Sequence, residues 1–140
     1  MIIRGNDKQI LHVSALFQGS THDYNLLKTI FDPIQDWFKD KEVVLDLGFQ
    51  GFQKDYLCES VKMPIKRKRV AKGISNELNQ EQKQYNHKVA SERMPIEHSI
   101  GQMKTFGCIQ GRTRTRNKQL LNTLVGLTAG IVNFKNSFSY

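Results

Sequence analysis

The sequence predicts an α/β protein, in which short strands alternate with helices. Three observations support this class: short apolar runs bounded by turn residues, apolar residues at helical spacing in two long segments, and a largely apolar segment near the end of the chain. Short apolar runs are typical of strands, whereas spacings of three and four residues are typical of helices. The chain has 140 residues, the size of one domain with a core of its own, so we expect a single domain over 1–140.

The first third of the chain predicts a hairpin followed by a helix. Apolar and β-branched residues at 2–3 and 10–17 flank a turn with the sequence Gly-Asn-Asp, which favours two paired strands. The glycine turn at 19–24 then leads into a predicted helix that runs to about Phe38. Its predicted core stripe consists of Leu26, Leu27, Ile30, Phe31, Ile34 and Trp37.

The segment 42–51 predicts a buried, parallel strand that ends in an acid. The apolar run Val43-Val44-Leu45 leads to Asp46 and then to a glycine-rich turn, as at the carboxyl edge of an α/β sheet. Burying a carboxylate there is unfavourable unless it is paired or bound to a metal. The alternative is a turn aspartate that accepts hydrogen bonds from the amides of Leu47 and Gly48.

A further strand is predicted at 61–65, and it is followed by a run of cations. The sequence has 21 Lys and Arg against 13 Asp and Glu, a net charge of +8, which favours nucleic acid as a partner and an anionic membrane second. A basic protein of another class would show the same excess. We expect phosphate contacts from two clusters, although a solvated loop is the simpler interpretation of the first. The clusters are Lys66, Arg67, Lys68 and Arg69, and Arg112, Arg114 and Arg116.

Cysteine usage and hydropathy predict a cytoplasmic protein. Cys58 and Cys108 are far apart and have no Cys-x-x-Cys partner, so we expect neither a disulfide framework nor a zinc knuckle. Charge follows Met1 at once, which is unlike a signal peptide, and the apolar run 124–132 is too short to span a bilayer. We therefore expect no membrane partner.

A long polar segment from residue 76 predicts one helix through 104, or two helices joined at Pro95. Residues three, four or seven apart share a helix face, so this helix has one apolar and one polar side. The apolar side consists of Val89, Ile96, Ile100 and Met103, and the polar side of Arg93, Glu97, Gly101 and Lys104. The polar side is either an active-site surface or a set of ordinary surface charges. The final segment, 120–134, predicts a largely buried helix.

The spacing Arg93-x3-Glu97-x6-Lys104 resembles the signature that closes the catalytic domain of DDE transposases of the IS4 and IS5 insertion-sequence groups. Ala90 stands where the IS4 group often has tyrosine, so the resemblance is to the IS5-like group. Asp46, followed by Leu-Gly-Phe-Gln-Gly, closely resembles the segment with the second catalytic aspartate of the same family. Both motifs occur in the family's order.

A third stretch, containing His22 and Asp23, resembles a segment that lies near the active site in these transposases. These two residues are second-rank candidates, and the alternative is that they cap the following helix. The resemblance implies a ribonuclease-H-like fold, with a mixed sheet flanked by helices, here lacking its first strand.

The resemblance also implies a metal-dependent reaction on DNA. Such sites hold two divalent ions about 4 Å apart, and oxygen ligands suit Mg²⁺ or Mn²⁺. Asp46 and Glu97 would be two metal ligands and Lys104 would contact the DNA backbone. Arg93 would orient Glu97 or neutralise phosphate charge.

The family's first catalytic aspartate is expected on a strand before the hairpin, and neither Asp7 nor Asp23 takes that place. We therefore predict the C-terminal part of a transposase, inactive alone, that binds transposon ends and the missing N-terminal part or another transposase subunit. The alternatives are a basic DNA-binding module without chemistry and a basic structural protein without a DNA role.

Overall fold

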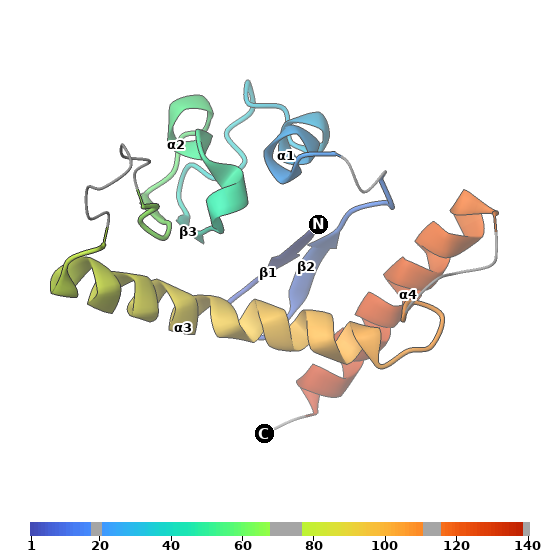
Figure 1. The fold of residues 1–140 in the computed structure, drawn as a ribbon. Coiled ribbons are helices and arrows are strands. Elements are labelled where there is room, and N and C mark those ends of the chain that lie inside the picture. The colour runs from blue at the N-terminus through green and yellow to red at the C-terminus, as the bar shows by residue number, and fades with distance from the viewer. Residues whose placement is uncertain (18–20, 68–76, 111–115, 139–140) are drawn as a thin grey trace. The chain divides into compact units, whose positions relative to one another are not determined.

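The computed structural model describes residues 1–17, 21–67, 77–110 and 116–138, and it is a mixed α/β structure (Figure 1). The described elements are β1 (Ile2–Arg4), β2 (Ile10–Val13), α1 (Asp23–Ile30), β3 (Glu42–Val44), the 3₁₀ turn η1 (Leu47–Phe49), α2 (Phe52–Asp55), β4 (Ser60–Lys62), α3 (Gln80–Lys104) and α4 (Lys118–Ser137). They form two compact units, residues 1–21 with 94–140 and residues 22–93, which are described separately. None of the helices in these described ranges is long and apolar enough to cross a membrane.

In the first unit, β1 and β2 form the predicted antiparallel hairpin. Ile2 lies opposite Val13 and Ile3 opposite His12, and the register shifts by a bulge before Arg4. Residues of β2, the end of α3 and α4 make the core of this unit. Its buried members are Ile10, Met103, Ala129 and Val132.

Asparagines on α4 bind the backbone of the hairpin. The side-chain amide of Asn133 accepts from the Ile10 N–H at 2.7 Å and donates to the Ile10 carbonyl at 2.9 Å. Asn122 accepts from the Leu16 N–H at 2.9 Å. Backbone N–H and C=O groups at a strand edge need hydrogen-bond partners. Here the side-chain amides of α4 supply the bonds that a neighbouring strand would otherwise make.

Replacing Asn133 by alanine should lower the free energy of unfolding by about 2 kcal/mol or more, since it leaves two partly buried backbone groups of Ile10 without partners. Asn136→Ala is the matched control, because Asn136 makes one exposed hydrogen bond, to the Lys8 carbonyl. It should cost about 1 kcal/mol or less. Denaturant unfolding followed by circular dichroism measures both, and equal losses would contradict this role of Asn133.

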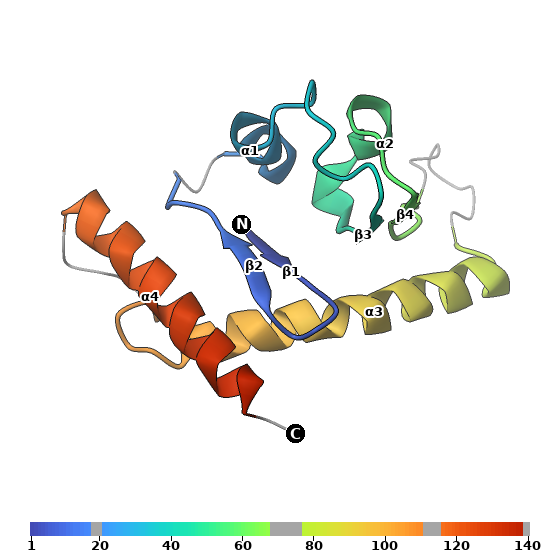
Figure 2. The same cartoon turned by 180° about the vertical axis from the view of Figure 1, so that it is seen from behind.

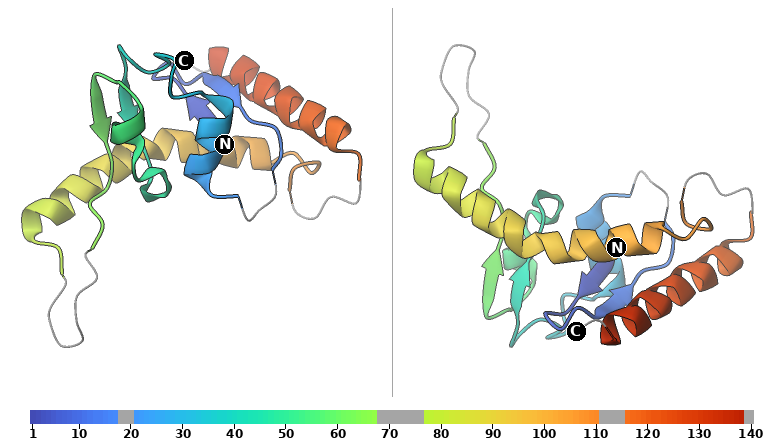
Figure 3. Two further views of the ribbon diagram at one scale, coloured as in Figure 1. Left: turned by 90° about the horizontal axis from the view of Figure 1, so that it is seen from above. Right: turned by 90° about the horizontal axis from the view of Figure 1, so that it is seen from below.

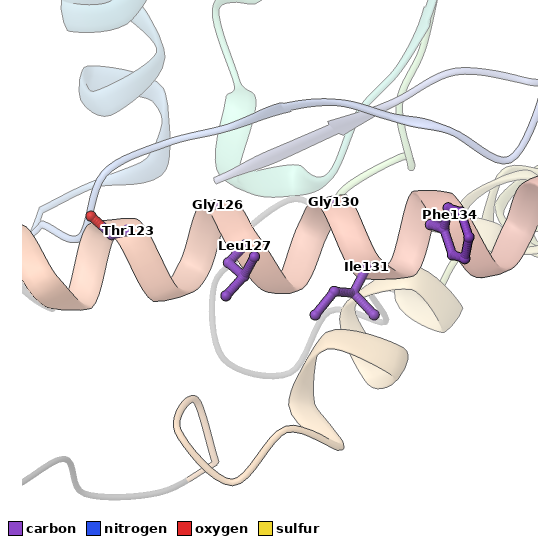
Figure 4. A pocket seen from close by; sticks show the side chains of 6 residues that line it. All are labelled: Thr123, Gly126, Leu127, Gly130, Ile131 and Phe134. Atoms are coloured by element: carbon purple, nitrogen blue, oxygen red, sulfur yellow. The ribbon is translucent and has the colours of Figure 1, made fainter.

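The prediction that the last helix is largely buried is wrong for one of its faces. Ala129 and Val132 are buried, but Leu127 is 58% and Phe134 67% exposed. The face of α4 that packs on β2 contains the asparagines and Val132. The remaining large apolar residues of α4 therefore lie outside this contact. They border an open apolar hollow lined by Thr123, Gly126, Leu127, Gly130, Ile131 and Phe134 (Figure 4).

In the second unit, α1 ends at Ile30 and does not reach Phe38 as predicted. Pro33 explains the early end, because the residue before a proline is disfavoured in helical conformation. Asp32 instead forms a turn, in which its carboxylate accepts from the Ile34 N–H at 3.0 Å. Ile34 is 89% exposed, so its place in the predicted core stripe is wrong, whereas Leu26 and Leu27 are buried as predicted.

An aromatic cluster forms much of the core of this unit. The Phe52 ring stacks on Tyr56 with centroids 4.8 Å apart and meets Phe38 edge-on at 5.3 Å. Phe31 extends the cluster, with Phe38 at 5.7 Å and Trp37 at 5.4 Å. The segment after α1 therefore does contribute to the core, but not as a helix. It folds as a turn that brings Phe38 into contact with Phe52 of α2.

Strands β3 and β4 pair in parallel, as predicted for the Asp46 segment, and lie next to each other in Figure 2. Val43 is opposite Val61, and the Leu45 N–H donates to the Lys62 carbonyl at 2.9 Å. Both strands are shorter than expected. In particular, β3 ends at Val44, before Asp46.

Helix α3 runs without interruption through Pro95, so the two-helix alternative is wrong (Figure 3). A proline removes one helical hydrogen bond, which a long helix can tolerate when its flanks are held. Asn79 and Gln82 form a reciprocal cap at its start, with bonds of 2.7 and 3.0 Å between each side chain and the other's N–H. The buried side chains of Val89 and Met103 confirm the predicted apolar face.

The carboxylate of Asp55 should make stability depend on pH. The hydroxyl of Tyr24 donates to Asp55, and this bond is the main cause that lowers the pKa of Asp55 below its ordinary 3.8. A carboxyl group whose pKa is lower in the folded state stabilises the fold above its unfolded pKa and loses that contribution as pH falls through the folded pKa. The stability difference between wild type and Tyr24→Phe should therefore shrink below about pH 4. Melting temperatures from pH 3 to 6 measure it, and a difference independent of pH would contradict the assignment.

Candidate functional site

Asp46 lies on the surface at the beginning of η1, two residues beyond β3. Its Oδ1 accepts from the Leu47 N–H at 2.7 Å, which confirms that part of the turn interpretation. Its Oδ2 lies 3.2 Å from the guanidinium of Arg93. The side chain is 54% exposed. The prediction of a buried strand is wrong, because β3 ends at Val44 and is only partly buried.

Arg93 comes from α3, and three features of the second unit fix this part of the helix: the bonds of Asn86, the buried Val89 and the ion pair of Glu92. Asn86 bonds both backbone groups of Ile65, at 2.7 and 3.1 Å. Spacings of three and four residues put Asn86, Val89 and Arg93 on one helix face, and Val89 is buried there. The ion pair between Arg93 and Asp46 therefore lies next to a buried, well-packed part of α3.

The third feature is the ion pair of Glu92 with Lys62, a lysine that also binds Glu42. The ammonium of Lys62 lies 2.7 Å from Glu42 of β3 and 3.0 Å from Glu92 of α3. The hydrogen bond with Glu42 is the largest cause that raises the pKa of Lys62, and the same bond lowers the pKa of Glu42. Sequence reasoning missed Lys62 and Glu92. The available signal was that Glu92 directly precedes Arg93, the first residue of the transposase-like signature.

The structure therefore brings together the two strongest motifs of the sequence, through Asp46 and Arg93. Glu97 follows Arg93 by one helical turn on α3 and is exposed, as is Lys104 at the end of the helix. Both belong to the unit that contains 94–140. Their approach to Asp46 stays a prediction.

Of the second-rank candidates, Asp23 lies beside the Asp46 motif. His22 caps α1, its Nδ1 accepting from the Tyr24 N–H at 3.3 Å, whereas Asp23 lies in the first turn, so the capping interpretation holds for His22 alone. The Asp23 carboxylate lies 3.1 Å from the point that a Cβ on Gly48 would occupy. Glycine at 48 therefore leaves room for Asp23, while Gly51 has a φ of 103°, which side chains rarely adopt.

The structure describes only some of the residues that are predicted to contact phosphates. Lys66, Arg67 and Arg116 are exposed, which suits contact with a polyanion. The remaining members, Lys68, Arg69, Arg112 and Arg114, lie outside the described residues.

Asp46 is a half-exposed carboxylate of the second unit and the one that belongs to a family motif. Among the residues that the structure describes, no three or more His, Cys, Asp or Glu side chains gather in a group that could hold a metal ion. Asp46 has the chemistry of one oxygen ligand, since its carboxylate is 54% exposed. Such a hard oxygen donor suits Mg²⁺ or Mn²⁺.

Comparison with known proteins agrees with the motifs. The family model described as DDE superfamily endonuclease matches residues 1–133, and the chain belongs to this family. A curated relative is the probable transposase for insertion sequence element IS702 of Microchaete diplosiphon, which is 30% identical over 118 residues. That alignment covers 84% of this chain and 39% of the relative, so the chain spans about two fifths of the relative's length. No solved structure matches the chain at a significant level. The predicted relationship to DDE transposases is thereby confirmed.

Proposed function

We propose that this chain is part of the catalytic domain of an insertion-sequence transposase, which cuts and joins DNA by a metal-dependent reaction. The observation that carries the proposal is the ion pair between Asp46 and Arg93. It joins the aspartate of one family motif to the arginine of the other, although the two are far apart in sequence. Membership of the DDE superfamily endonucleases supports the same function.

In this proposal, Asp46 and Glu97 supply oxygen ligands for Mg²⁺ or Mn²⁺. The ions would activate the attacking oxygen and stabilise the leaving oxygen of the phosphodiester. Lys104 contacts the DNA backbone, and the cations at 66–69 and 112–116 bind phosphates. We further propose that residues 1–140 belong to one ribonuclease-H-like domain.

Cleavage should require more than these 140 residues. The family uses three carboxylates, and the chain offers Asp46 and Glu97 but no counterpart of the first aspartate at its expected place. The chain alone should therefore bind DNA without cutting it. Its partners would be transposon ends and another part or subunit of a transposase, in the cytoplasm at the nucleoid. Mg²⁺-dependent nicking by the purified chain would contradict this part of the proposal.

Binding of Mn²⁺, followed by electron paramagnetic resonance, tests the metal site. Asp46→Asn and Glu97→Gln should each weaken binding on the order of tenfold or more, because removing a ligand has a larger effect than removing an outer partner. Asp36→Asn is the matched control, since Asp36 is also 54% exposed and also paired with a cation, Lys39. If all three variants bind Mn²⁺ equally, the proposed metal site is wrong.

A basic DNA-binding module without chemistry is the second candidate. The net charge of +8 and the exposed Lys66 and Arg67 favour it. For such a module, Asp46→Ala and Glu97→Ala should leave the affinity for DNA almost unchanged. Neither residue should bind Mn²⁺. The Mn²⁺ measurement therefore separates the two candidates.

A further inference from the structure

We propose that one face of α4 binds the same face of a second copy of this chain, with the two helices antiparallel and crossing at Gly130. This outer face consists of Leu120, Leu127, Phe134 and Phe138 together with the hollow between them. It contains none of the residues proposed to bind metal or phosphate, so the pairing is independent of the proposed reaction on DNA.

Helix α4 is apolar on two opposite sides, and only one of them is covered. Ala129 and Val132 are buried in the core with β2 and the end of α3. At about 3.6 residues per turn, Leu127 and Phe134 lie on the side opposite to this core, where they are 58% and 67% exposed (Figure 4). A helix that is apolar all round is normally buried all round. The outer face therefore indicates a partner beyond the described contacts.

The chemistry of the outer face selects an apolar partner. Between Gln119 and Phe134 the sequence has no charged residue, although the chain carries a net charge of +8. Of the described residues that line the hollow, only Thr123 has a polar side chain, and its hydroxyl already donates to the Gln119 carbonyl at 2.9 Å. Phosphates are bound by cations and by free polar donors. DNA therefore does not fit this face, whereas an apolar helix does.

Two glycines in the middle of α4 have no role in the contacts that the structure describes. Gly126 and Gly130 are exposed, and glycine is less favourable than alanine in a helix interior. Apart from the chain neighbours and the nearby backbone of α4, no atom of the described residues lies within 4 Å of the point that a Cβ on either glycine would occupy. The missing side chains leave room for a second helix to approach closely.

The outer face has both a knob and a matching hollow, which favours a second copy as its occupant. The rings of Phe134 and Phe138 contact each other with centroids 4.8 Å apart, so the knob is ordered in the single chain. Phe134 lies four residues after Gly130, and Gly126 lies four residues before it. In an antiparallel pair that crosses at Gly130, Phe134 of each copy therefore lies over Gly126 of the other. Such reciprocal contacts define a two-fold symmetric dimer.

The size of the outer face indicates a reversible dimer. Phe134 and Phe138 are about two-thirds exposed, and each leaves on the order of 100 Å² or more in water. With the half-exposed Leu120 and Leu127, the apolar surface reaches several hundred Å², at the upper end of what a monomer exposes in one place. A standard interface takes about 800 Å² from each partner, so the outer face supplies about half of one. We expect a Kd in the micromolar range.

Sedimentation equilibrium over a series of concentrations tests the pairing. The mass should rise from that of one full chain to that of two, with a midpoint at micromolar concentration. Added salt should strengthen the association or leave it unchanged, because it screens the repulsion between two chains of charge +8. Association that salt abolishes would show bridging by bound nucleic acid and overturns the proposal. A chain that stays monomeric overturns it as well and leaves the face for another protein.

Truncation of the knob tests the face itself. Phe134→Ala should raise the Kd of the dimer about tenfold or more, because it removes a central aromatic contact. Leu11→Ala is the matched control: Leu11 is 66% exposed in the same unit, and strand alternation puts it opposite the buried Ile10. It should leave the Kd unchanged. Circular dichroism at low concentration should show equal folding of both variants. Equal Kd values for the two variants overturn the proposal.

Gly130→Leu separates close approach from helix stability. Leucine is a better helix former than glycine, so the single chain should unfold at the same or a higher temperature. The Kd of the dimer should nevertheless rise about tenfold or more, because the new side chain holds the helices apart at their crossing. Non-specific association would instead increase, since leucine adds apolar surface. A variant that associates as well as wild type overturns the crossing at Gly130.

A distance between spin labels tests the direction of the two helices. Cys58 and Cys108 are replaced by serine, and a nitroxide is attached through Lys118→Cys. At about 1.5 Å per residue, an antiparallel crossing at Gly130 puts the two labels about 35 Å apart. A parallel pair would bring them to about the 8–10 Å between helix axes, and this shorter distance overturns the antiparallel arrangement.

Discussion

Phe52→Ala is expected to lower the free energy of unfolding of the second unit by about 3–5 kcal/mol. Phe52 is 1% exposed and touches Tyr56 and Phe38 through its ring. Removing the ring leaves a cavity between aromatic residues that are themselves fixed by neighbours, so collapse around it is restricted. The expected decrease in stability is therefore larger than the one expected for Asn133→Ala.

The fluorescence of Trp37 can report this unfolding. Trp37 is the single tryptophan of the chain, and its ring contacts Phe31 in the same aromatic cluster. Denaturant unfolding followed by its fluorescence should show an earlier midpoint for Phe52→Ala. Ile34→Ala is the control, since Ile34 is 89% exposed in the same unit and its truncation should change stability by about 0.5 kcal/mol or less. Similar decreases from both substitutions would contradict the assigned core.

Neutralising the four cations at 66–69 with glutamine should have the largest effect on DNA binding. Every cation that no longer binds a phosphate should reduce the slope of log affinity against log salt by about 0.9, because fewer counterions are released. Affinity should fall together with the slope, without regard to DNA sequence, because phosphate contacts carry no sequence information. Fluorescence anisotropy with labelled duplexes at several salt concentrations measures both quantities.

The control for this experiment removes the same charge elsewhere. Glutamine at the four exposed positions Lys39, Lys41, Lys54 and Lys83 gives an equal change in net charge. We expect this variant to keep most of the salt dependence. If both sets reduce the slope equally, DNA binding reflects the overall charge of the chain and not a phosphate-binding segment at 66–69.

The family was predictable from sequence because its evidence is local. The spacing of Arg93, Glu97 and Lys104 and the acid-glycine pattern after Asp46 are contained in short segments. The hairpin and the parallel pairing of the Asp46 segment were also predicted correctly, since turn residues and apolar runs mark them directly.

Helix boundaries and exposed faces were less predictable. Apolar spacing continues through Ile34 and Trp37, yet Pro33 ends α1 early and the chain turns back. On α4, apolar residues lie on more than one side, and only the face that docks on β2 is buried. Periodicity indicates that a face is apolar, but docking determines whether it is covered.

The sequence by itself determined the class of this protein, its basic charge and the residues that are candidates for its chemistry. The tertiary structure alone decided that Arg93 pairs with Asp46, that Lys62 links Glu42 to Glu92, and that Asp23 lies against Gly48. The physical reason is that such contacts join residues distant along the chain. Their distances depend on how helices and strands pack, and no local pattern specifies that packing.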